Sequence, residues 1–434
     1  YKIIYKNNES INIESINIDS TIINNLSNLD SEFKSNIDAF LEKNEKKYSL
    51  CIDEYLKYDN ISISEYFSLK NIKRIFLLDF FDNYKNIIDK ISNNPLINKI
   101  LLWPSLFIGS KPSNISGIFT ILTHNMLKNG TKIYDKNGMI ALIQELEIYL
   151  NKLDVKIYKN SSVNKFIFYE NNICGVKLTN NDIIDCNYVI SSADYYFTEN
   201  LLPNKYRTYS KLYWDKQIMC PSSLVFNIIL NKKLDNLLYH NLFLINDLQN
   251  HINNIYDDKS IPIDPLFYVN ITSKIFKHEC ENNKHENLFI LIPTSNYHLL
   301  DKFDIKYLLN NVISQISNYV GFDIEQHIID IKYTKDSDFN NRFNAYKNNA
   351  YGLSCENYQY AFFRPKIKSR YVNNLYYCGQ TSCPGPGIPP SMISGLNSSN
   401  LLMKEHSNKD KYSKNFALIR MADKARKQQQ LNMS

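Results

Sequence analysis

The sequence has 434 residues, of which 44% are hydrophobic and 22% are charged, and its formal net charge is +6. A chain of this length can bury a large core, and we expect two or more domains. The positive charge is mild and spread along the chain. It gives weak support for an acidic membrane surface as a partner and none for a nucleic acid.

The cysteines and histidines give no sign of a disulfide framework or a metal site. The eight cysteines lie without CxxC spacing at positions 51, 174, 186, 220, 280, 355, 378 and 383, which favours a reduced, cytoplasmic protein. His278 and His285 lack the further ligands that a metal needs, so we expect no metal. No run of about 18 apolar residues predicts a membrane-spanning helix, and peripheral membrane association stays open.

The first part of the chain is predicted to form a hairpin followed by helices. Two β-rich runs within residues 1–13 flank a polar turn. Asp30 is a good N-cap for a helix that we expect to reach Leu56. Ser64 can cap a second helix with an aromatic face, and the apolar stretch 96–108 follows. We expect this region to pack on its own core, and the alternative is that it dips into a bilayer interface.

The middle of the chain begins with a strand and turn at 130–138 and a helix with one apolar side, formed by Leu142, Ile143, Leu146, Tyr149 and Leu150. Strands around Asn-rich turns are predicted at 155–158, 162–169, 173–178 and 183–186. A buried strand follows within 188–194, where Asp194 by itself is a typical helix cap. Three further β-rich runs suit an antiparallel sheet that forms the floor of a substrate pocket, at 224–230, 266–271 and 288–293.

The C-terminal part contains a cluster of glycine and proline that is rare elsewhere in the chain. Four of the 11 glycines and four of the 13 prolines lie within residues 374–395. An apolar run at 375–378 predicts a strand, and 391–403 has helical spacing. The order is therefore strand, rigid turn and helix. The N–H groups at such a helix start suit an anion or an electron-rich ring edge, and a tight surface turn is an equally good interpretation of the residues alone.

Specific motifs resemble the bacterial-type phytoene desaturases and related carotenoid desaturases, which are FAD-dependent, amine-oxidase-like flavoproteins. The motifs are Phe363-Arg-Pro, Asn374-Leu-Tyr-Tyr-Cys-Gly-Gln-Thr and Pro384-Gly-Pro-Gly-Ile-Pro-Pro, with a weaker likeness over 130–194. The resemblance implies an α/β (α+β) fold with two dinucleotide-binding halves. It further implies a Rossmann-like FAD-binding domain, an antiparallel-sheet substrate domain and a helical subdomain that faces the membrane.

The resemblance also implies roles for single residues. Val163 would hold the adenine end of FAD through its backbone, and 191–194 would close the sheet near the cofactor. The ring edge would lie against the turn, at Gly379, Gly387, Ile388 and Ser391. Arg342 and Arg364 are weak catalytic candidates, since they could place positive charge beside reduced flavin, and surface salt bridges are the equally good alternative.

The same likeness divides the chain into five parts. They are a hairpin with a helical, membrane-associating region (1–128), the middle of the FAD-binding domain (129–198), the substrate-binding domain (199–355), the C-terminal part of the FAD-binding domain (356–405) and a basic tail (406–434). The chain departs from the family in one respect, because no three glycines have the GxGxxG spacing that binds a pyrophosphate. Either the sequence begins downstream of that motif, which the Tyr1 start favours, or the protein is a pseudoenzyme.

The function implied is FAD-dependent desaturation of a long isoprenoid hydrocarbon such as phytoene, with oxygen or a quinone as the electron acceptor. The substrate would come from a membrane surface, and the chemistry would belong largely to the flavin. A carotenoid isomerase or saturase of the same fold remains an alternative. A flavin-free prenyl-lipid carrier resembling the Rab GDP-dissociation inhibitors is another.

Overall fold

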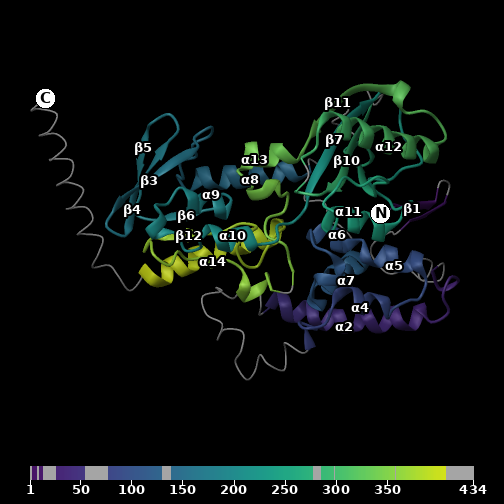
Figure 1. The fold of residues 1–434 in the computed structure, drawn as a ribbon, viewed down its shortest axis with the longest axis horizontal. Coiled ribbons are helices and arrows are strands. Elements are labelled where there is room, and N and C mark those ends of the chain that lie inside the picture. Colours follow the sequence, from purple (N-terminus) through teal and green to yellow (C-terminus); the bar gives the residue numbers. More distant parts are fainter. Residues whose placement is uncertain are drawn as a thin grey trace, which may run out of the picture.

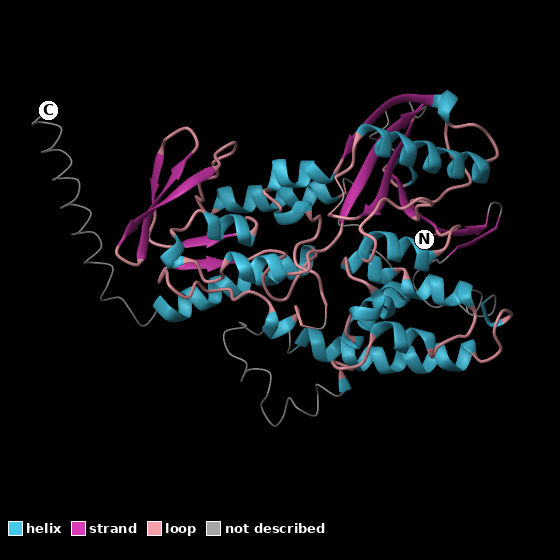
Figure 2. Cartoon of the chain, viewed as in Figure 1, coloured by secondary structure: helices cyan, strands magenta, loops and turns pink. Residues whose placement is uncertain are grey.

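The computed structural model describes residues 2–6, 9–12, 26–53, 77–129, 138–276, 285–297, 299–356 and 358–406. These residues form a sheet with a long helix on it, a set of helices beside the sheet, and a third part built around two parallel strands (Figure 1). We call these parts the sheet group, the helical group and the turn group. Figure 2 shows that helices dominate the helical group, while both other groups mix helices and strands.

The sheet group contains seven described strands in the order β11-β7-β10-β9-β8-β1-β2. Their bounds are Lys2–Lys6 (β1), Glu9–Asn12 (β2), Ser222–Leu230 (β7), His240–Phe243 (β8), Phe267–Ile271 (β9), Glu286–Thr294 (β10) and Ile328–Thr334 (β11). Neighbours pair antiparallel, except that β1 pairs parallel with β8. The hairpin at the start of the chain therefore joins a sheet whose other strands come much later in the sequence.

One face of this sheet is covered by α12 (Lys302–Val320). Alternate residues of β7, including Leu224 and Phe226, share a fully buried apolar cluster with Leu308 of the helix. Each such side chain contributes about 2 kcal/mol when it is removed from water. Burial alternates only from Phe226 to Leu230, because successive side chains point to opposite faces, whereas residues 222–226 are all buried.

The helical group lies below the sheet in the view of Figure 1. It consists of α2 (Phe33–Asp53), α4 (Tyr84–Asp89), α5 (Pro95–Leu102), α6 (Pro104–Ile108) and α7 (Thr120–Asn129), and α11 (Leu248–Tyr256) lies between it and the sheet. Its apolar cluster includes the fully buried Trp103. The buried Lys47 ammonium pairs with the Asp79 carboxylate and donates to the Thr120 hydroxyl. Both contacts offset the cost of burying its charge.

The turn group is built on the parallel pair β6 (Val189–Ser191) and β12 (Leu375–Tyr377). Around it lie a meander, β3 (Val163–Tyr169), β4 (Asn172–Leu178) and β5 (Ile183–Asp185), and the helices α8 (Met139–Lys152), α9 (Tyr195–Asn200), α10 (Lys211–Lys216), α13 (Asp336–Phe343) and α14 (Ile388–His406). Short 3-10 helices occur at Pro112–Asn114, Gly117–Phe119, Asn204–Tyr206, Thr272–Lys274, Glu325–His327, Tyr346–Asn348 and Ala361–Phe363.

Most predicted elements are confirmed. The hairpin, the helix after Asp30, the meander, the three long strands of the sheet, the strand at 375–378 and the final helix are all present. Asp194 caps α9 by accepting a hydrogen bond from the Phe197 N–H group at 3.0 Å. The mixture of an antiparallel sheet with a parallel pair and helices is the α/β (α+β) arrangement that was expected.

Two predictions were wrong. Residues 155–158 form no strand, and none of the described strands lies beside this β-rich run to supply hydrogen bonds. The strand within 188–194 is present but is only partly buried, and Ile190 is 42% exposed, because no described element covers the face on which Ile190 lies.

Three predictions lie wholly or mainly outside the described residues: the helix after Ser64, the strand and turn at 130–138, and the basic tail. In the ranges that the structure does describe, no helix is long and apolar enough to cross a membrane.

Candidate active site

The glycine-proline turn joins β12 to α14 and requires its glycines. Gly379, Gly385 and Gly387 have φ values of +96°, +134° and +113°, a region that residues with a side chain rarely adopt. A Cβ at Gly387 would lie 3.3 Å from the Cδ of Pro390. Since Pro389 and Pro390 lie in the first turn of the helix, where an N–H group has no helical partner, they fit without loss of a hydrogen bond.

Arg364 braces this turn from within the protein. Its side chain is 1% exposed, and its Nη1 donates to the carbonyl oxygens of Gln380 and Thr381, both at 3.1 Å. Its Nη2 donates to the Leu353 carbonyl at 2.8 Å. A Cβ at Gly385 would come within 3.3 Å of the guanidinium. The charge of Arg364 is therefore directed at backbone carbonyls, and it fixes the shape of the turn.

Two serine hydroxyls and one serine N–H group of α14 also hold the turn. The Ser394 hydroxyl accepts from the Gly379 N–H group at 2.7 Å, and the Ser398 hydroxyl donates to the Tyr377 carbonyl at 2.6 Å. The Ser391 N–H group donates to the Gly387 carbonyl at 2.9 Å. The N–H groups of Gly379 and Ser391 are thus engaged inside the protein, which leaves Gly387 and Ile388 as the donors at the positive end of α14.

The two remaining residues singled out from the sequence lie apart from this bracing. Val163 is the first residue of β3 and pairs with Leu178. Arg342 is exposed on the last turn of α13, with its guanidinium 5.5 Å from the ring of Phe343. No hydrogen bond joins Arg342 to the turn among the residues that the structure describes.

A buried tyrosine-carboxylate pair lies directly before the turn. The Tyr377 hydroxyl donates to the Glu199 carboxylate at 2.5 Å, and the Tyr377 ring stacks on Tyr195 at 3.9 Å between centroids. Burial raises the pKa of Glu199. The Glu199 carboxylate also accepts from the Tyr209 N–H group at 3.1 Å, so both of its oxygens are occupied and its role is to fix β12.

A second buried carboxylate, Glu356, lies on the other side of the turn and was not expected from the sequence. It is 4% exposed, and its Oε2 accepts from the Asn114 side chain at 3.0 Å. Burial raises its pKa, while the Asn114 hydrogen bond and the charge of Lys111 lower it. No motif marks this residue, since its partners come from a distant part of the chain.

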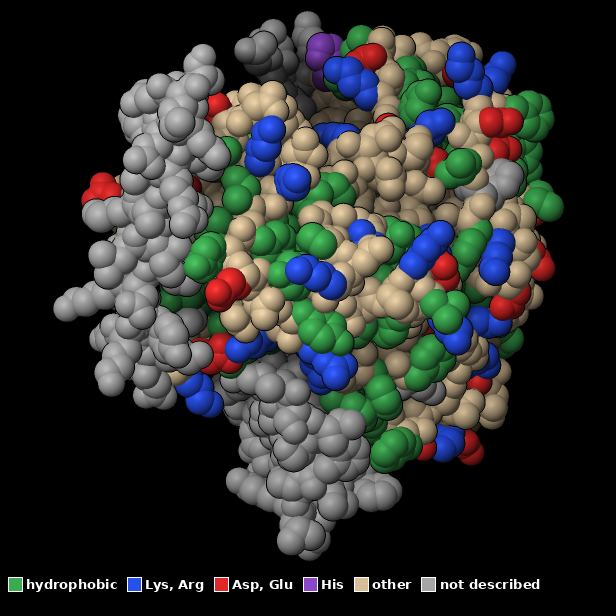
Figure 3. Space-filling view, turned by 60° about the vertical axis from the view of Figure 1, so that its left-hand side comes forward, with side chains coloured by type: hydrophobic (Ala, Val, Ile, Leu, Met, Phe, Trp, Pro, Cys, Tyr) green, Lys and Arg blue, Asp and Glu red, His purple; other side chains and the backbone are tan. Residues whose placement is uncertain are grey.

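The outer surface of the turn group carries many apolar side chains. Only Ala141 of α8 is buried, whereas Ile143 and Tyr149 are 58% and 60% exposed. Figure 3 shows apolar side chains scattered between lysines and arginines on this side of the molecule. The predicted apolar side of α8 exists, but no described residue covers it.

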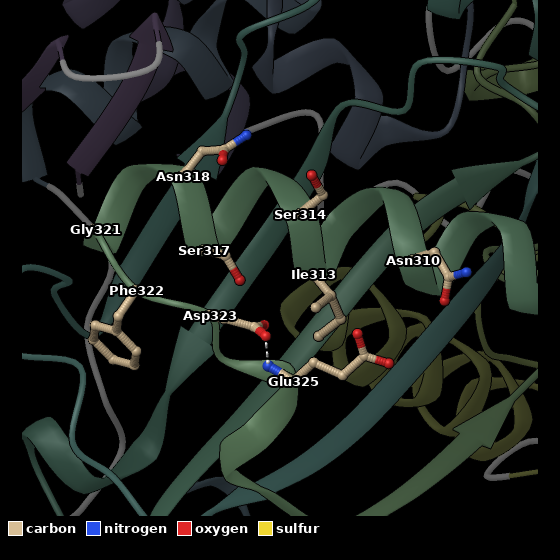
Figure 4. Close-up of a pocket in the computed structure, with 9 residues that line it drawn as sticks. All are labelled: Asn310, Ile313, Ser314, Ser317, Asn318, Gly321, Phe322, Asp323 and Glu325. Carbon is tan, nitrogen blue, oxygen red and sulfur yellow. Dashed lines mark hydrogen bonds between the residues drawn. The ribbon is translucent and has the colours of Figure 1, made fainter.

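A hollow of about 650 Å³ lies far from the turn, at the C-terminal end of α12 (Figure 4). Its lining is mostly small and polar, with Asn310, Ser314 and Ser317 on the helix. The Asp323 carboxylate there accepts from the Glu325 N–H group at 2.9 Å. No group of three or more metal-binding side chains occurs in the described part of the chain.

The fold is shared with solved structures of a known oxidase. Solved structures of putrescine oxidase superpose with TM-scores of 0.56 for one variant and 0.54 for the wild type bound to putrescine. They share 10% and 11% of residues and cover 93% and 92% of this chain and 80% of theirs. At this level of identity the likeness establishes the fold.

The chain belongs to the flavin containing amine oxidoreductase family, whose model matches residues 84–403. It is 25% identical over 371 residues to a carotenoid 3,4-desaturase of Haloarcula japonica, covering 85% of this chain and 74% of that protein. It is 26% identical over 376 residues to a 1-hydroxycarotenoid 3,4-desaturase of Flavobacterium sp., covering 86% and 76%. A phytoene desaturase of Fusarium fujikuroi matches at 24%, covering 81% and 65%.

These relatives confirm the resemblance to the carotenoid desaturases, and family membership makes the protein an FAD-dependent oxidoreductase. The residues of the turn fit a flavin ring edge. Three glycines with positive φ allow close approach of the backbone, and the N-terminal end of a 19-residue helix supplies a positive dipole. The N–H groups of Gly387 and Ile388 lie at this end of the helix.

Proposed function

We propose that this protein catalyses the FAD-dependent desaturation of a long isoprenoid hydrocarbon such as phytoene, as a step of carotenoid biosynthesis. The observation that carries the proposal is the match to a 1-hydroxycarotenoid 3,4-desaturase over 86% of the chain, together with the glycine-proline turn at the start of α14. The bond that reacts is a CH–CH single bond, which becomes part of a conjugated system.

FAD, when bound, supplies the acceptor for a hydride from an allylic carbon. The N–H groups of Gly387 and Ile388 stabilise negative charge at the ring edge, because they are fixed before the reaction begins. Arg364 keeps these groups in place through its hydrogen bonds to Gln380 and Thr381. Val163 is proposed to meet the adenine end through its backbone. Arg342 is too exposed to act on an enclosed substrate.

The domain division follows from the same proposal. Residues 129–198 and 356–405 hold the cofactor, and 199–355 with the hairpin of 1–128 hold the substrate. The sheet face opposite α12 supports this role, since Tyr268 is partly exposed there and the ring of Phe107 from α6 lies 6.4 Å from it. A hydrocarbon offers no polar group, so an apolar, aromatic surface must bind it.

The helical group is proposed to lie on the membrane from which the substrate enters. Phe81 and Leu122 of this group are 70% and 42% exposed, and large exposed apolar side chains suit the interface of a bilayer. Oxygen or a quinone would reoxidise the flavin. A quinone fits the membrane location, because it dissolves in the same lipid as the substrate.

The test is expression of the complete reading frame in cells that make phytoene, followed by pigment analysis and measurement of bound flavin. We expect new conjugated polyenes and a yellow purified protein. Unchanged phytoene beside a folded, flavin-loaded protein would reject desaturation. New geometrical isomers without new double bonds would instead indicate an isomerase. A colourless protein that extracts prenylated proteins from membranes would indicate a carrier.

Gly387→Val tests the turn as the flavin site. The side chain is incompatible with a φ of +113° and blocks the approach of the ring, so we expect loss of bound flavin from a protein whose circular dichroism is unchanged. Gly395→Ala, on α14, is the control, because no atom lies within 4 Å of a Cβ there. Full flavin content in the valine variant would remove the turn from the site.

A further inference from the structure

The proposed reaction needs a group that accepts a proton. Desaturation removes a hydride from one carbon and a proton from its neighbour, and the flavin takes the hydride. Neither Arg342 nor Arg364 can take the proton, because a guanidinium is always protonated in proteins. A carboxylate close to the turn and shielded from water is the kind of group that the step requires.

We propose that Glu356 is the proton acceptor in desaturation, an inference that rests on the proposed function. Its neighbour Cys355 receives a hydrogen bond from Nη2 of Arg364 at 3.4 Å. The other nitrogen of Arg364, Nη1, holds the carbonyls of Gln380 and Thr381. One buried guanidinium therefore ties the segment that carries Glu356 directly to the turn.

The same segment touches the sheet group. The Cys220 N–H group, just before β7, donates to the Gly352 carbonyl at 2.9 Å. The Gly352 backbone is packed against Gln380 of the turn, since a Cβ there would lie 2.9 Å from the Gln380 side chain. The start of β7 and the turn thus meet at residues 352–356.

The helical group reaches Glu356 from the third side. Asn114 donates to its Oε2 at 3.0 Å, and Ile115 forms an antiparallel bridge with Glu356. The carboxylate lies where all three groups meet, and it is 4% exposed. Residues 352–356 therefore connect the sheet group, which is proposed to hold the substrate, with the turn that is proposed to hold the flavin.

The hydrogen bonding of Glu356 differs from that of three other buried carboxylates, Glu199, Asp194 and Glu286. Glu199 and Asp194 each accept from two protein donors, one on each oxygen. Glu286 also uses both oxygens, with Ser273 and the Leu234 N–H group. In the described residues Glu356 accepts from Asn114 alone, on Oε2. A carboxylate that is anchored by one oxygen keeps the other for a proton.

A buried hydroxyl without a partner lies close to the same carboxylate. The Tyr256 hydroxyl of α11 is buried and has no hydrogen-bond partner in the described part of the structure. Burial raises the pKa of Tyr256 well above its usual value, and the charges of Cys220 and Glu356 add to this effect. A buried polar atom without a partner is unfavourable unless something binds there, which marks the junction as a place where a ligand or a proton is handled.

The step balances as follows. FAD, when bound, would accept the electron pair and hydrogen of one allylic C–H bond as a hydride. The C–H bond of the adjacent carbon breaks, its proton goes to the Oε1 atom of Glu356, and its electron pair becomes the new double bond. The substrate loses two hydrogen atoms in total, and Glu356 returns its proton to solvent before the next turnover.

Glu356→Gln removes the base and keeps the Asn114 hydrogen bond, because the amide oxygen can replace Oε2. We expect the rate of flavin reduction by phytoene in a single turnover of the complete holoenzyme to fall by about 100-fold or more. Flavin content and the binding of an unreactive saturated isoprenoid should stay unchanged. Glu286→Gln is the matched control, since it neutralises a buried carboxylate at the far end of β10 from the turn.

A pH profile separates a base from a structural residue. The titratable or charged groups around Glu356 are Lys111, Cys220, Tyr256, Cys355 and Tyr358. The reaction needs the ionised form, so the rate rises as pH rises through the pKa of Glu356. Asn114→Ala removes the hydrogen bond that favours ionisation, and it should move this limb to higher pH. Infrared titration of the carboxyl group, as wild type minus Glu356→Gln, should show the same shift without any substrate.

The outcomes distinguish the two proposals. If phytoene does not reduce the flavin of the wild-type protein, both the proposed function and the role of Glu356 fall. If it does, and Glu356→Gln is reduced as fast as wild type with an unchanged pH limb, the role of Glu356 alone is overturned. The role of Glu356 is supported if Glu356→Gln is slow and Glu356→Asp restores the rate. In Asn114→Ala, the pH limb of the rate and the infrared titration should both be displaced.

Discussion

The sheet group and the glycine-proline turn are stabilised in different ways. In the sheet group, side chains such as Leu224, Leu308 and Val312 are fully buried between the strands and α12. In the turn group, apolar residues of α8 such as Ile143 and Ile148 are more than half exposed. The contacts that hold the turn are polar, from Arg364 and the serines of α14.

This difference shows which type of interaction suits the proposed role of each region. Apolar burial is strong but non-directional, which suits a surface that has to accept a featureless hydrocarbon. Hydrogen bonds have defined geometry, which suits a turn that has to hold backbone N–H groups against a ring. The contrast predicts that replacing the polar side chains that hold the turn destabilises the turn. Truncating buried apolar side chains should instead destabilise the sheet group.

The largest effect is expected from Arg364→Leu. Its loss leaves the buried carbonyls of Leu353, Gln380 and Thr381 without their donor, and we expect the free energy of unfolding to fall by about 4 kcal/mol. Urea unfolding of the flavin-free protein measures it. Arg342→Leu, on the exposed end of α13, is the control and should change stability by less than about 0.5 kcal/mol. Equal effects in the two variants would show that the turn does not depend on this brace.

Leu308→Ala should have the next largest effect. Leu308 is fully buried between α12 and the sheet, and truncation there leaves a cavity and costs about 3 kcal/mol. The same urea experiment measures the loss. Phe303→Ala on the same helix serves as the control, since its side chain is 75% exposed. A loss of less than about 1 kcal/mol would mean that apolar burial does not hold the sheet group.

Acid should weaken the junction of α11 with the sheet through His251. This residue is 1% exposed, its Nδ1 accepts from the Leu266 N–H group at 3.2 Å, and burial lowers its pKa to about 3. Because the folded pKa is depressed, the stabilisation is complete above about pH 6.5 and is lost as pH falls toward 3. Lowering the pH from 7 to 5 should remove about 2 kcal/mol of stability in wild type. His251→Gln should lack this component when midpoints are compared at both pH values.

The smallest effect is expected from Ile143→Ser on α8. The side chain is 58% exposed, so the free energy of unfolding should change by less than about 0.5 kcal/mol. Self-association of the protein, measured by light scattering, should decrease because an exposed apolar patch shrinks. A loss above about 2 kcal/mol would show that this face of α8 is covered in solution.

Local patterns were sufficient for much of the fold. The β-rich runs of β7, β9 and β10 predicted the sheet, and the cluster of Gly379, Gly385 and Gly387 predicted the turn, since both signals depend on neighbouring residues only. The run at 155–158 failed because strand propensity is realised only when a partner strand is present. Arg364 was noticed from its motif, but its contacts with Gln380 and Leu353 could not be derived from spacing.

Glu356 shows most clearly what could not be predicted from the sequence. Its donor Asn114 lies in a different group of the fold, and nothing in the residues around either position marks the other. The amino-acid sequence by itself established strands, helix ends, the rigid turn and the family, because these depend on backbone preference and short-range pattern. Burial, the brace beneath the turn and the position of the carboxylate were decided by packing, because solvent exclusion and hydrogen bonds between distant segments exist only after the chain has folded.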